Sequence, residues 1–173
     1  MFKFNNLTEE TRQFMEDEVR EDIKNGTLYY GKYLSQRGKQ LYPDLLIKSI
    51  KTGNESTLAQ SLVGLFDEYT YKNNRSGVAS LAKVPCNANL TLAEGEFNRF
   101  YIRALCRIAM VSGRKLRIYR AKMSLNPRPE SQMKIGAFID ANKLLSDLRS
   151  NQGTDTALGL PPGPNSGLSV ELV

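Results

Sequence analysis

The sequence predicts a mainly α-helical domain, a helical bundle with a small β-hairpin and an extended C-terminal arm. Several segments carry apolar side chains at helical spacing, whereas residues 115–122 combine β-branched and aromatic side chains with short-range alternation. Residues 161–167 form a Pro- and Gly-rich run that is typical of a linker. The length of 173 residues fits one domain, which we place at residues 1–152, with the arm at residues 153–173.

The first predicted helix covers residues 7–25. Thr8 is a suitable N-cap, and Gly26 supplies a left-handed stop. Its apolar stripe consists of Phe14, Met15, Val19 and Ile23. Residues 27–33 read as a strand or as an extended connector.

Two further helices are expected before the middle of the chain. Residues 35–53 form one helix, or two short helices broken near Gly38 and Pro43. Asn54 then caps a third helix that reaches Tyr69. Residues 71–88 are polar and rich in turn formers, which predicts an exposed loop with a short strand at residues 78–84.

The chain is organised around residues 89–122. Apolar side chains recur at helical spacing, at Phe97, Phe100, Tyr101, Ala104, Leu105 and Ile108. Asn89 or Thr91 is a suitable cap for the start of this helix, and Gly113 supplies its stop. Gly95 costs about 1 kcal/mol inside a helix, which favours the alternative of a start nearer Glu96. A strand follows at residues 115–122. A second strand at residues 133–139 would pair with it, and Asp140 caps a last helix.

Positive charge gathers in this central stretch. Residues 99–128 hold nine Lys or Arg and no Asp or Glu, in a chain of net charge +6. One interpretation is a solvated arginine-rich surface on an ordinary core helix. The other is a face for an anionic partner, either nucleic acid or an acidic protein surface. The residues assigned to that face are Arg99, Arg103, Arg107, Arg114, Arg117 and Arg120.

Negative charge gathers in the first helix, where residues 9–22 hold seven acids and two bases. This is a solvated outer face, or it complements the basic stretch within the subunit or between neighbouring subunits. The arm ends in an alternating segment that would add to a neighbour's sheet or fold back on its own domain. The predicted subunit contacts are Glu9, Glu16, Glu21, Leu168, Val170 and Leu172.

Histidine is absent, which removes Ser/His and Cys/His nucleophile pairs and most catalytic zinc sites. Cys86 and Cys106 do not have metal-ligand spacing, and Cys106 is expected in the core. We therefore expect no catalytic residues, no metal and no cofactor, although an enzyme using Glu94, Glu96 or Glu130 is a third reading. The sequence contains no run of 18 apolar residues, so it predicts no membrane span, and the N-terminus has no apolar signal core.

The layout resembles the neck proteins of tailed bacteriophages, the adaptors that form a ring below the portal. The resemblance rests on the short helices, the polar loop at residues 71–88 and the C-terminal arm. It implies a non-enzymatic homo-oligomer of the virion that is made in the host cytoplasm, contacts portal or other virion proteins through its arm, and touches DNA without sequence specificity. A capsid-associated structural protein has similar features. The alternative function is a sequence-independent nucleic-acid-binding accessory protein.

Overall fold

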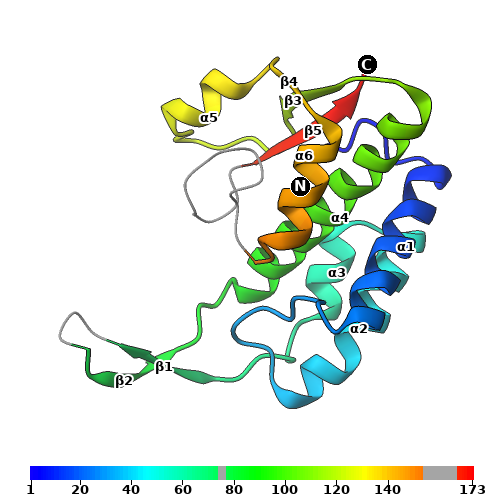
Figure 1. Cartoon of the computed structure of the whole chain (residues 1–173). Coiled ribbons are helices and arrows are strands. Elements are labelled where there is room, and N and C mark those ends of the chain that lie inside the picture. Colours follow the sequence, from blue (N-terminus) through cyan, green and yellow to red (C-terminus); the bar gives the residue numbers. More distant parts are fainter. Residues whose placement is uncertain (74–76, 154–166) are drawn as a thin grey trace.

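The computed structural model describes residues 1–73, 77–153 and 167–173, and it confirms the predicted mainly α-helical class (Figure 1). The helices are α1 (Glu9–Asn25), α2 (Gln36–Thr52), α3 (Glu55–Ser61), α4 (Ala88–Ser112), α5 (Pro129–Lys134) and α6 (Ala141–Ser150). The strands are β1 (Tyr69–Asn73), β2 (Ala79–Lys83), β3 (Leu116–Arg120), β4 (Phe138–Ile139) and β5 (Leu168–Leu172). Most of the predicted linker run, residues 161–166, lies outside the described residues.

Helix α4 runs through the middle of the molecule, and α1, α3, α6 and β5 pack around it (Figure 1). All six of its predicted apolar side chains are buried, and Cys106 lies in the core with them. The helix begins at Ala88, close to the start that a cap at Asn89 predicts and well before Glu96, so Gly95 lies inside it. The helix ends at Gly113, whose φ of 71° is left-handed as predicted. Packing on several sides therefore outweighs the helix cost of Gly95.

Local capping explains where α1 and α6 begin. The Thr8 side chain accepts a hydrogen bond from the backbone N–H of Thr11, and the Asp140 side chain accepts one from Lys143. Gly26 ends α1 at a φ of 67°. These three positions match the sequence-based expectation.

The second and third helices differ from one another in how well they were predicted. Helix α2 is continuous, with Pro43 inside it, so it does not break into two. Asn54 caps α3 as expected, but α3 ends at Ser61 and the predicted continuation to Tyr69 is wrong. Gly64 turns the chain at a φ of 76°, and Phe66 then forms a β-bridge with Leu34. Residues 27–33 form a connector that leads from α1 to Leu34 in this bridge.

A three-stranded antiparallel sheet in the order β4-β3-β5 lies beside the end of α4. The second strand is shorter than predicted, because Pro129 starts α5 and leaves only Phe138 and Ile139 to pair with β3. Strand β5 pairs with β3 along its whole length, from Leu116 with Leu172 to Arg120 with Leu168. The end of the predicted arm is therefore folded back on its own domain. Within the described ranges, no helix has the length and apolar character needed to cross a bilayer.

Candidate assembly surfaces

Arg103, the centre of the predicted basic face, is inside the molecule with a side chain that is 0% exposed. Its guanidinium donates to both carboxylate oxygens of Asp22, at 2.6 and 2.9 Å, and to Glu18 at 2.7 Å. Such a bidentate pair holds the planar guanidinium in one orientation. The acidic helix α1 and the basic helix α4 therefore complement each other within the subunit, which is one of the interpretations left open by the sequence. The prediction that Arg103 faces a partner is wrong.

Glu18 is shared by several arginines. Arg149 of α6 donates to it at 2.5 Å, and Arg107 does so at 3.4 Å while its guanidinium lies over the Phe14 ring. Burial alone would raise the pKa of the Glu18 carboxyl, but hydrogen bonds from Arg149 and the charge of Arg103 together lower that pKa below its ordinary value. The cluster therefore joins α1, α4 and α6 by charge.

Arg99 is also internal, which corrects the prediction for this residue as well. It is paired with Glu96 at 3.2 Å and donates to the backbone carbonyl of Asn151 at 2.9 Å, just past the end of α6. Burial raises the pKa of the Glu96 carboxyl, although the charge of Arg99 opposes this. Arg99 thus ties the C-terminal end of α6 to the central helix.

The remaining three arginines contact the sheet and its neighbours. Arg114 donates to the carbonyl of Leu172 at 3.1 Å, and Arg117 pairs with Glu171 at 2.8 Å. Arg120 lies 3.4 Å from the side-chain oxygen of Gln132. The six arginines therefore do not form one exposed basic face, because two are buried and the others bond largely to their own chain.

The predicted subunit contacts separate into two groups. Glu9 and Glu21 are exposed on α1, as a contact requires. Glu16 is buried and pairs with Arg20 and Lys51. The three apolar side chains of β5, Leu168, Val170 and Leu172, lie in the hydrophobic core. The prediction of subunit contacts through Glu16 and these three side chains is therefore wrong, because all four contact residues of their own subunit.

An exposed β-hairpin projects from the helical body where the sequence predicted a polar loop (Figure 1). Tyr71 is paired across the strands with Leu81, and Tyr69 with Lys83. Because alternate residues of a strand share a face, Tyr69, Tyr71 and Leu81 lie on one side of the hairpin. Thr70 is paired with Ala82 and Lys72 with Ser80, so the other side carries no large apolar side chain.

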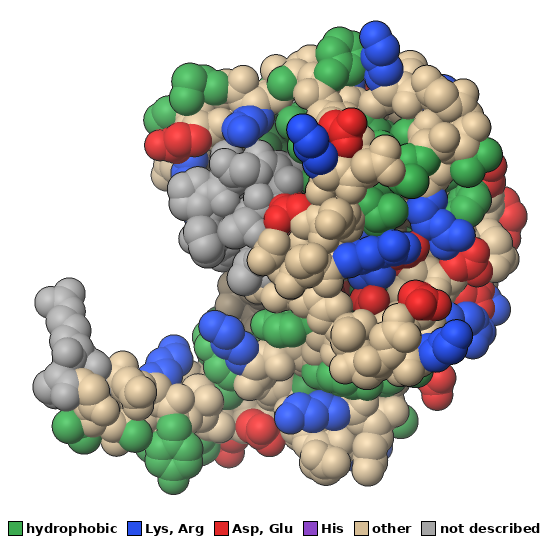
Figure 2. Space-filling model, viewed as in Figure 1, with side chains coloured by type: hydrophobic (Ala, Val, Ile, Leu, Met, Phe, Trp, Pro, Cys, Tyr) green, Lys and Arg blue, Asp and Glu red, His purple; other side chains and the backbone are tan. Residues whose placement is uncertain are grey.

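The apolar side of this hairpin faces solvent. Tyr71 is 77% exposed and Leu81 is 60% exposed, and no side chain of β1 or β2 belongs to the core (Figure 2). A two-stranded hairpin is marginally stable unless a third strand or another layer packs on it. Among the described residues no such layer covers the pair of Tyr71 and Leu81.

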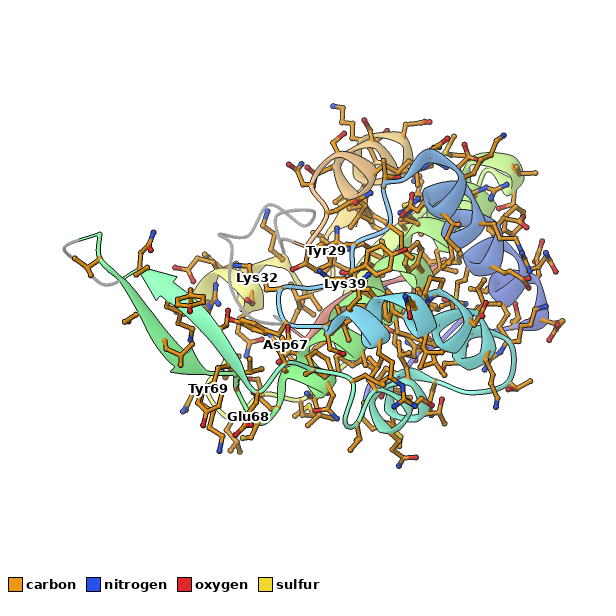
Figure 3. All side chains as sticks on the ribbon, turned by 90° about the horizontal axis from the view of Figure 1, so that it is seen from below. Tyr29, Lys32, Lys39, Asp67, Glu68 and Tyr69 are labelled. Carbon is orange, nitrogen blue, oxygen red and sulfur yellow. The ribbon has the colours of Figure 1, made fainter. Side chains whose placement is uncertain are left out.

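The acidic residues Asp67 and Glu68 lie at the base of the hairpin, beside Tyr69 (Figure 3). Both acids are exposed. The backbone N–H of Asp67 donates to the carbonyl of Tyr33, and that of Val84 donates to the carbonyl of Glu68. The first bond fixes the base of the hairpin to the connector before α2, and the second extends the pairing of the two hairpin strands by one step.

A second exposed apolar surface lies on the connection between β3 and β4. We call it the α5 segment; its members are Met123, Leu125, Met133, Ile135 and Phe138, all exposed. Large exposed apolar patches commonly mark contacts with other proteins. Arg128 and Lys134 lie in the same stretch of chain and make no ion pair with the described part of the protein.

In the described ranges, no group of three or more His, Cys, Asp or Glu side chains is placed to hold a metal ion. A shallow groove between the end of α4 and β4 is lined by Met110, Arg114, Phe138 and Asp140. Its carboxylate, Asp140, is occupied as the cap of α6.

Sequence reasoning missed the apolar side of the hairpin because Tyr69 was assigned to the third helix. The available signal was the alternation of Tyr69, Thr70, Tyr71 and Lys72, followed by a turn at Gly77. Comparison with known protein families, with curated proteins and with solved structures finds no match to this chain.

Proposed function

We propose that this chain is a non-enzymatic structural subunit of a virus particle, a neck or adaptor protein of the tailed-phage type. It forms a ring at the portal, is made in the host cytoplasm and ends in the virion. The part that holds a neighbouring portal or other virion protein is the β1–β2 hairpin rather than the C-terminal arm, since β5 is bonded to its own sheet.

The observation that carries this proposal is the exposed apolar side of the hairpin. Tyr71 and Leu81 stand opposite each other on a two-stranded sheet with no further layer among the described residues. A solvent-facing pair of this kind is costly in a subunit that works alone. In a subunit of a larger assembly, the same side chains are buried by the neighbour.

The alternative function, nucleic-acid binding through the arginines, has lost its main support. Arg99 and Arg103 are buried and paired inside the chain, so they are not available to phosphate groups. The remaining arginines would give only a sequence-independent contact, which a ring around DNA would also make.

The proposal is tested by binding to the portal ring of the same phage, measured by co-sedimentation and light scattering. Tyr71→Ser combined with Leu81→Ser removes two apolar side chains, each worth about 1.5–3 kcal/mol when buried. We expect the affinity of this double variant to fall by at least about tenfold, with an unchanged circular dichroism spectrum.

The matched control changes the polar side of the same two strands, with Thr70→Ser and Ser80→Thr. We expect this control to bind like the wild type. Equal binding by the apolar-side variant, or a wild type that binds neither portal nor shell and remains monomeric, would contradict the proposal.

A further inference from the structure

The pairing register of the β1–β2 hairpin determines which backbone groups point away from it. The backbone N–H of Val84 donates to the carbonyl of Glu68, so these two residues form a hydrogen-bonded pair. In an antiparallel ladder, bonded pairs alternate with pairs that exchange no hydrogen bond. Tyr71 and Leu81 therefore form a non-bonded pair, and their backbone N–H and C=O groups point outward from the two strands.

Both outer edges of the hairpin are open in the described part of the chain. The sheet has only two strands, and it projects from the helical body (Figure 1). The residues with outward backbone groups are Tyr69, Tyr71 and Asn73 on β1, and Ala79, Leu81 and Lys83 on β2. None of these groups takes part in a hydrogen bond with the described residues. An unpaired strand edge of this kind is a template for a further strand.

The outer edge of β5, in the other sheet, is closed by side chains. The backbone N–H of Leu172 donates to Asn6 at 3.0 Å, and its carbonyl accepts from Arg114 at 3.1 Å. Asn98 donates to the carbonyl of Leu168 at 2.9 Å. The chain therefore covers the edge of the strand that belongs to its body, whereas it leaves the edges of the hairpin uncovered.

The edge of β1 offers more apolar contact than the edge of β2. Neighbouring strands lie about 4.8 Å apart, and side chains directly opposite each other are in contact. A strand beside β1 would meet two tyrosines, Tyr69 at 50% exposure and Tyr71 at 77%. A strand beside β2 would meet Leu81 between Ala79 and Lys83. The aromatic pair therefore favours β1 as the edge that receives a strand.

Charges along β1 add a direction to this edge. Glu68 directly precedes the strand and Lys72 lies near its other end, and both side chains are exposed. Neither makes an ion pair within the described ranges. Complementary charges on a partner fix its register and orientation. A segment with an acid beside Lys72 and a base beside Glu68 fits this edge in one direction only.

We propose that β1 accepts an extended segment of the neighbouring virion protein as a third strand of the hairpin sheet. The segment bonds to the outward backbone groups of β1, places apolar side chains against Tyr69 and Tyr71, and places an acid beside Lys72. A third strand supplies the pairing that a two-stranded hairpin needs for stability. This inference rests on the proposed function, because it states how the hairpin holds the protein to which it binds.

The test blocks one edge at a time in the full-length chain. Asn73 and Ala79 lie directly opposite each other in a non-bonded pair. Proline at either position removes an outward N–H and no bond of the ladder, which is where strands tolerate proline. Binding to the portal ring of the same phage is measured by co-sedimentation. We expect Asn73→Pro to bind at least about tenfold more weakly than wild type, and Ala79→Pro to bind like wild type.

Amide hydrogen exchange of the wild type gives a second readout that needs no variant. In the free subunit, the amide of Tyr71 should exchange faster than that of Lys72, which is bonded within the ladder. On binding to the portal ring, exchange at Tyr71 and Asn73 should slow by at least about tenfold, and exchange at Leu81 should stay the same. This measurement decides the matter if a proline variant loses the hairpin.

Failure of this inference differs from failure of the proposed function. If both proline variants bind like wild type while Tyr71→Ser with Leu81→Ser does not, strand addition is wrong and the hairpin contact stands. Lost binding in Ala79→Pro, or slowed exchange at Leu81, would overturn the choice of β1. Self-association of the free subunit that Asn73→Pro abolishes would show that a second copy supplies the strand, and would overturn the assignment to another virion protein. A wild type that does not bind the portal ring contradicts both.

Discussion

The Arg103 guanidinium donates to both oxygens of the Asp22 carboxylate, over 2.6 and 2.9 Å, in a place where the arginine side chain is fully buried. This pair fixes α4 against α1. It also accounts for much of the charge asymmetry of the sequence, since the basic central helix and the acidic first helix neutralise each other inside the subunit. Glu9 and Lys134, by contrast, make no ion pair within the described part of the chain.

Removing Arg103 should strongly destabilise the fold. Arg103→Leu leaves Glu18 and Asp22 buried with fewer counter-charges, and breaking a buried ion pair in this way costs about 3–5 kcal/mol. We expect the free energy of unfolding, measured by guanidinium titration, to fall by that amount. The control is Arg20→Leu, because Arg20 itself is exposed and Glu16 keeps Lys51 as a partner, so the loss should be less than about 1 kcal/mol. Equal losses in the two variants would contradict an internal role for Arg103.

The charge cluster predicts a dependence of stability on pH. The pKa of Glu18 is lower in the folded chain than its ordinary value of about 4.3, because the arginines outweigh its burial. Its contribution is therefore present above the unfolded pKa and is lost as the pH falls through the folded pKa. Burial raises the pKa of Glu96, so the contribution of this residue to stability falls as the pH rises through that pKa.

Glu18→Gln should therefore be less stable than wild type at neutral pH, with a difference that shrinks below about pH 4. Urea titrations at a series of pH values between about 3 and 7 measure the difference in the free energy of unfolding between the two proteins. A difference between the two proteins that stays constant over the whole range would show that the carboxylate charge of Glu18 does not stabilise the fold.

Strand β5 should contribute to the stability of the domain rather than act as a detachable arm. Leu168 is 1% exposed, and Leu168→Ala should cost about 2–5 kcal/mol because it leaves a cavity in the core. Val173→Ala, at an exposed neighbouring position, should change stability by less than about 0.5 kcal/mol. Thermal melting of both variants decides this, and an unchanged melting temperature for Leu168→Ala would be inconsistent with a buried strand.

Gly38 should resist substitution although it lies in a helix. A β-carbon at this position would lie 2.2 Å from the backbone oxygen of Leu65, so Gly38→Ala forces α2 away from the turn after α3. We expect a loss of about 1–3 kcal/mol, against the gain of about 1 kcal/mol that alanine usually gives in a helix. Lys39→Ala, at an exposed position one residue later, serves as control. A stabilised Gly38→Ala variant would refute the close approach.

Local signals in the sequence predicted the helix ends well. Thr8, Gly26, Gly113 and Asp140 act through neighbouring backbone atoms, so short sequence patterns identify them. The prediction extended the third helix too far because apolar side chains at helical spacing continue past Ser61. There the chain instead satisfies its backbone through a bridge with residue 34, which is a distant contact.

The burial of Arg103 was not predicted because charge was considered without the spacing of its partners. Met15, Glu18, Val19 and Asp22 recur at i, i+3, i+4 and i+7, so two acids occupy positions that face the core. Buried acids need a buried base, which was a signal for an internal pair. The hairpin had a weaker local signal, the alternation of Tyr69, Thr70, Tyr71 and Lys72, and the apolar spacing of the preceding helix outweighed it.

The solvent accessibility of Tyr71 in the assembled protein tests the central claim most directly. Hydroxyl-radical footprinting of the dilute subunit and of its portal-bound form measures it, with the exposed residue Val63 as an internal reference. We predict that oxidation of Tyr71 slows several-fold on binding while that of Val63 stays the same. Equal oxidation of Tyr71 in the two forms would contradict the claim that the hairpin is the contact with a neighbouring protein.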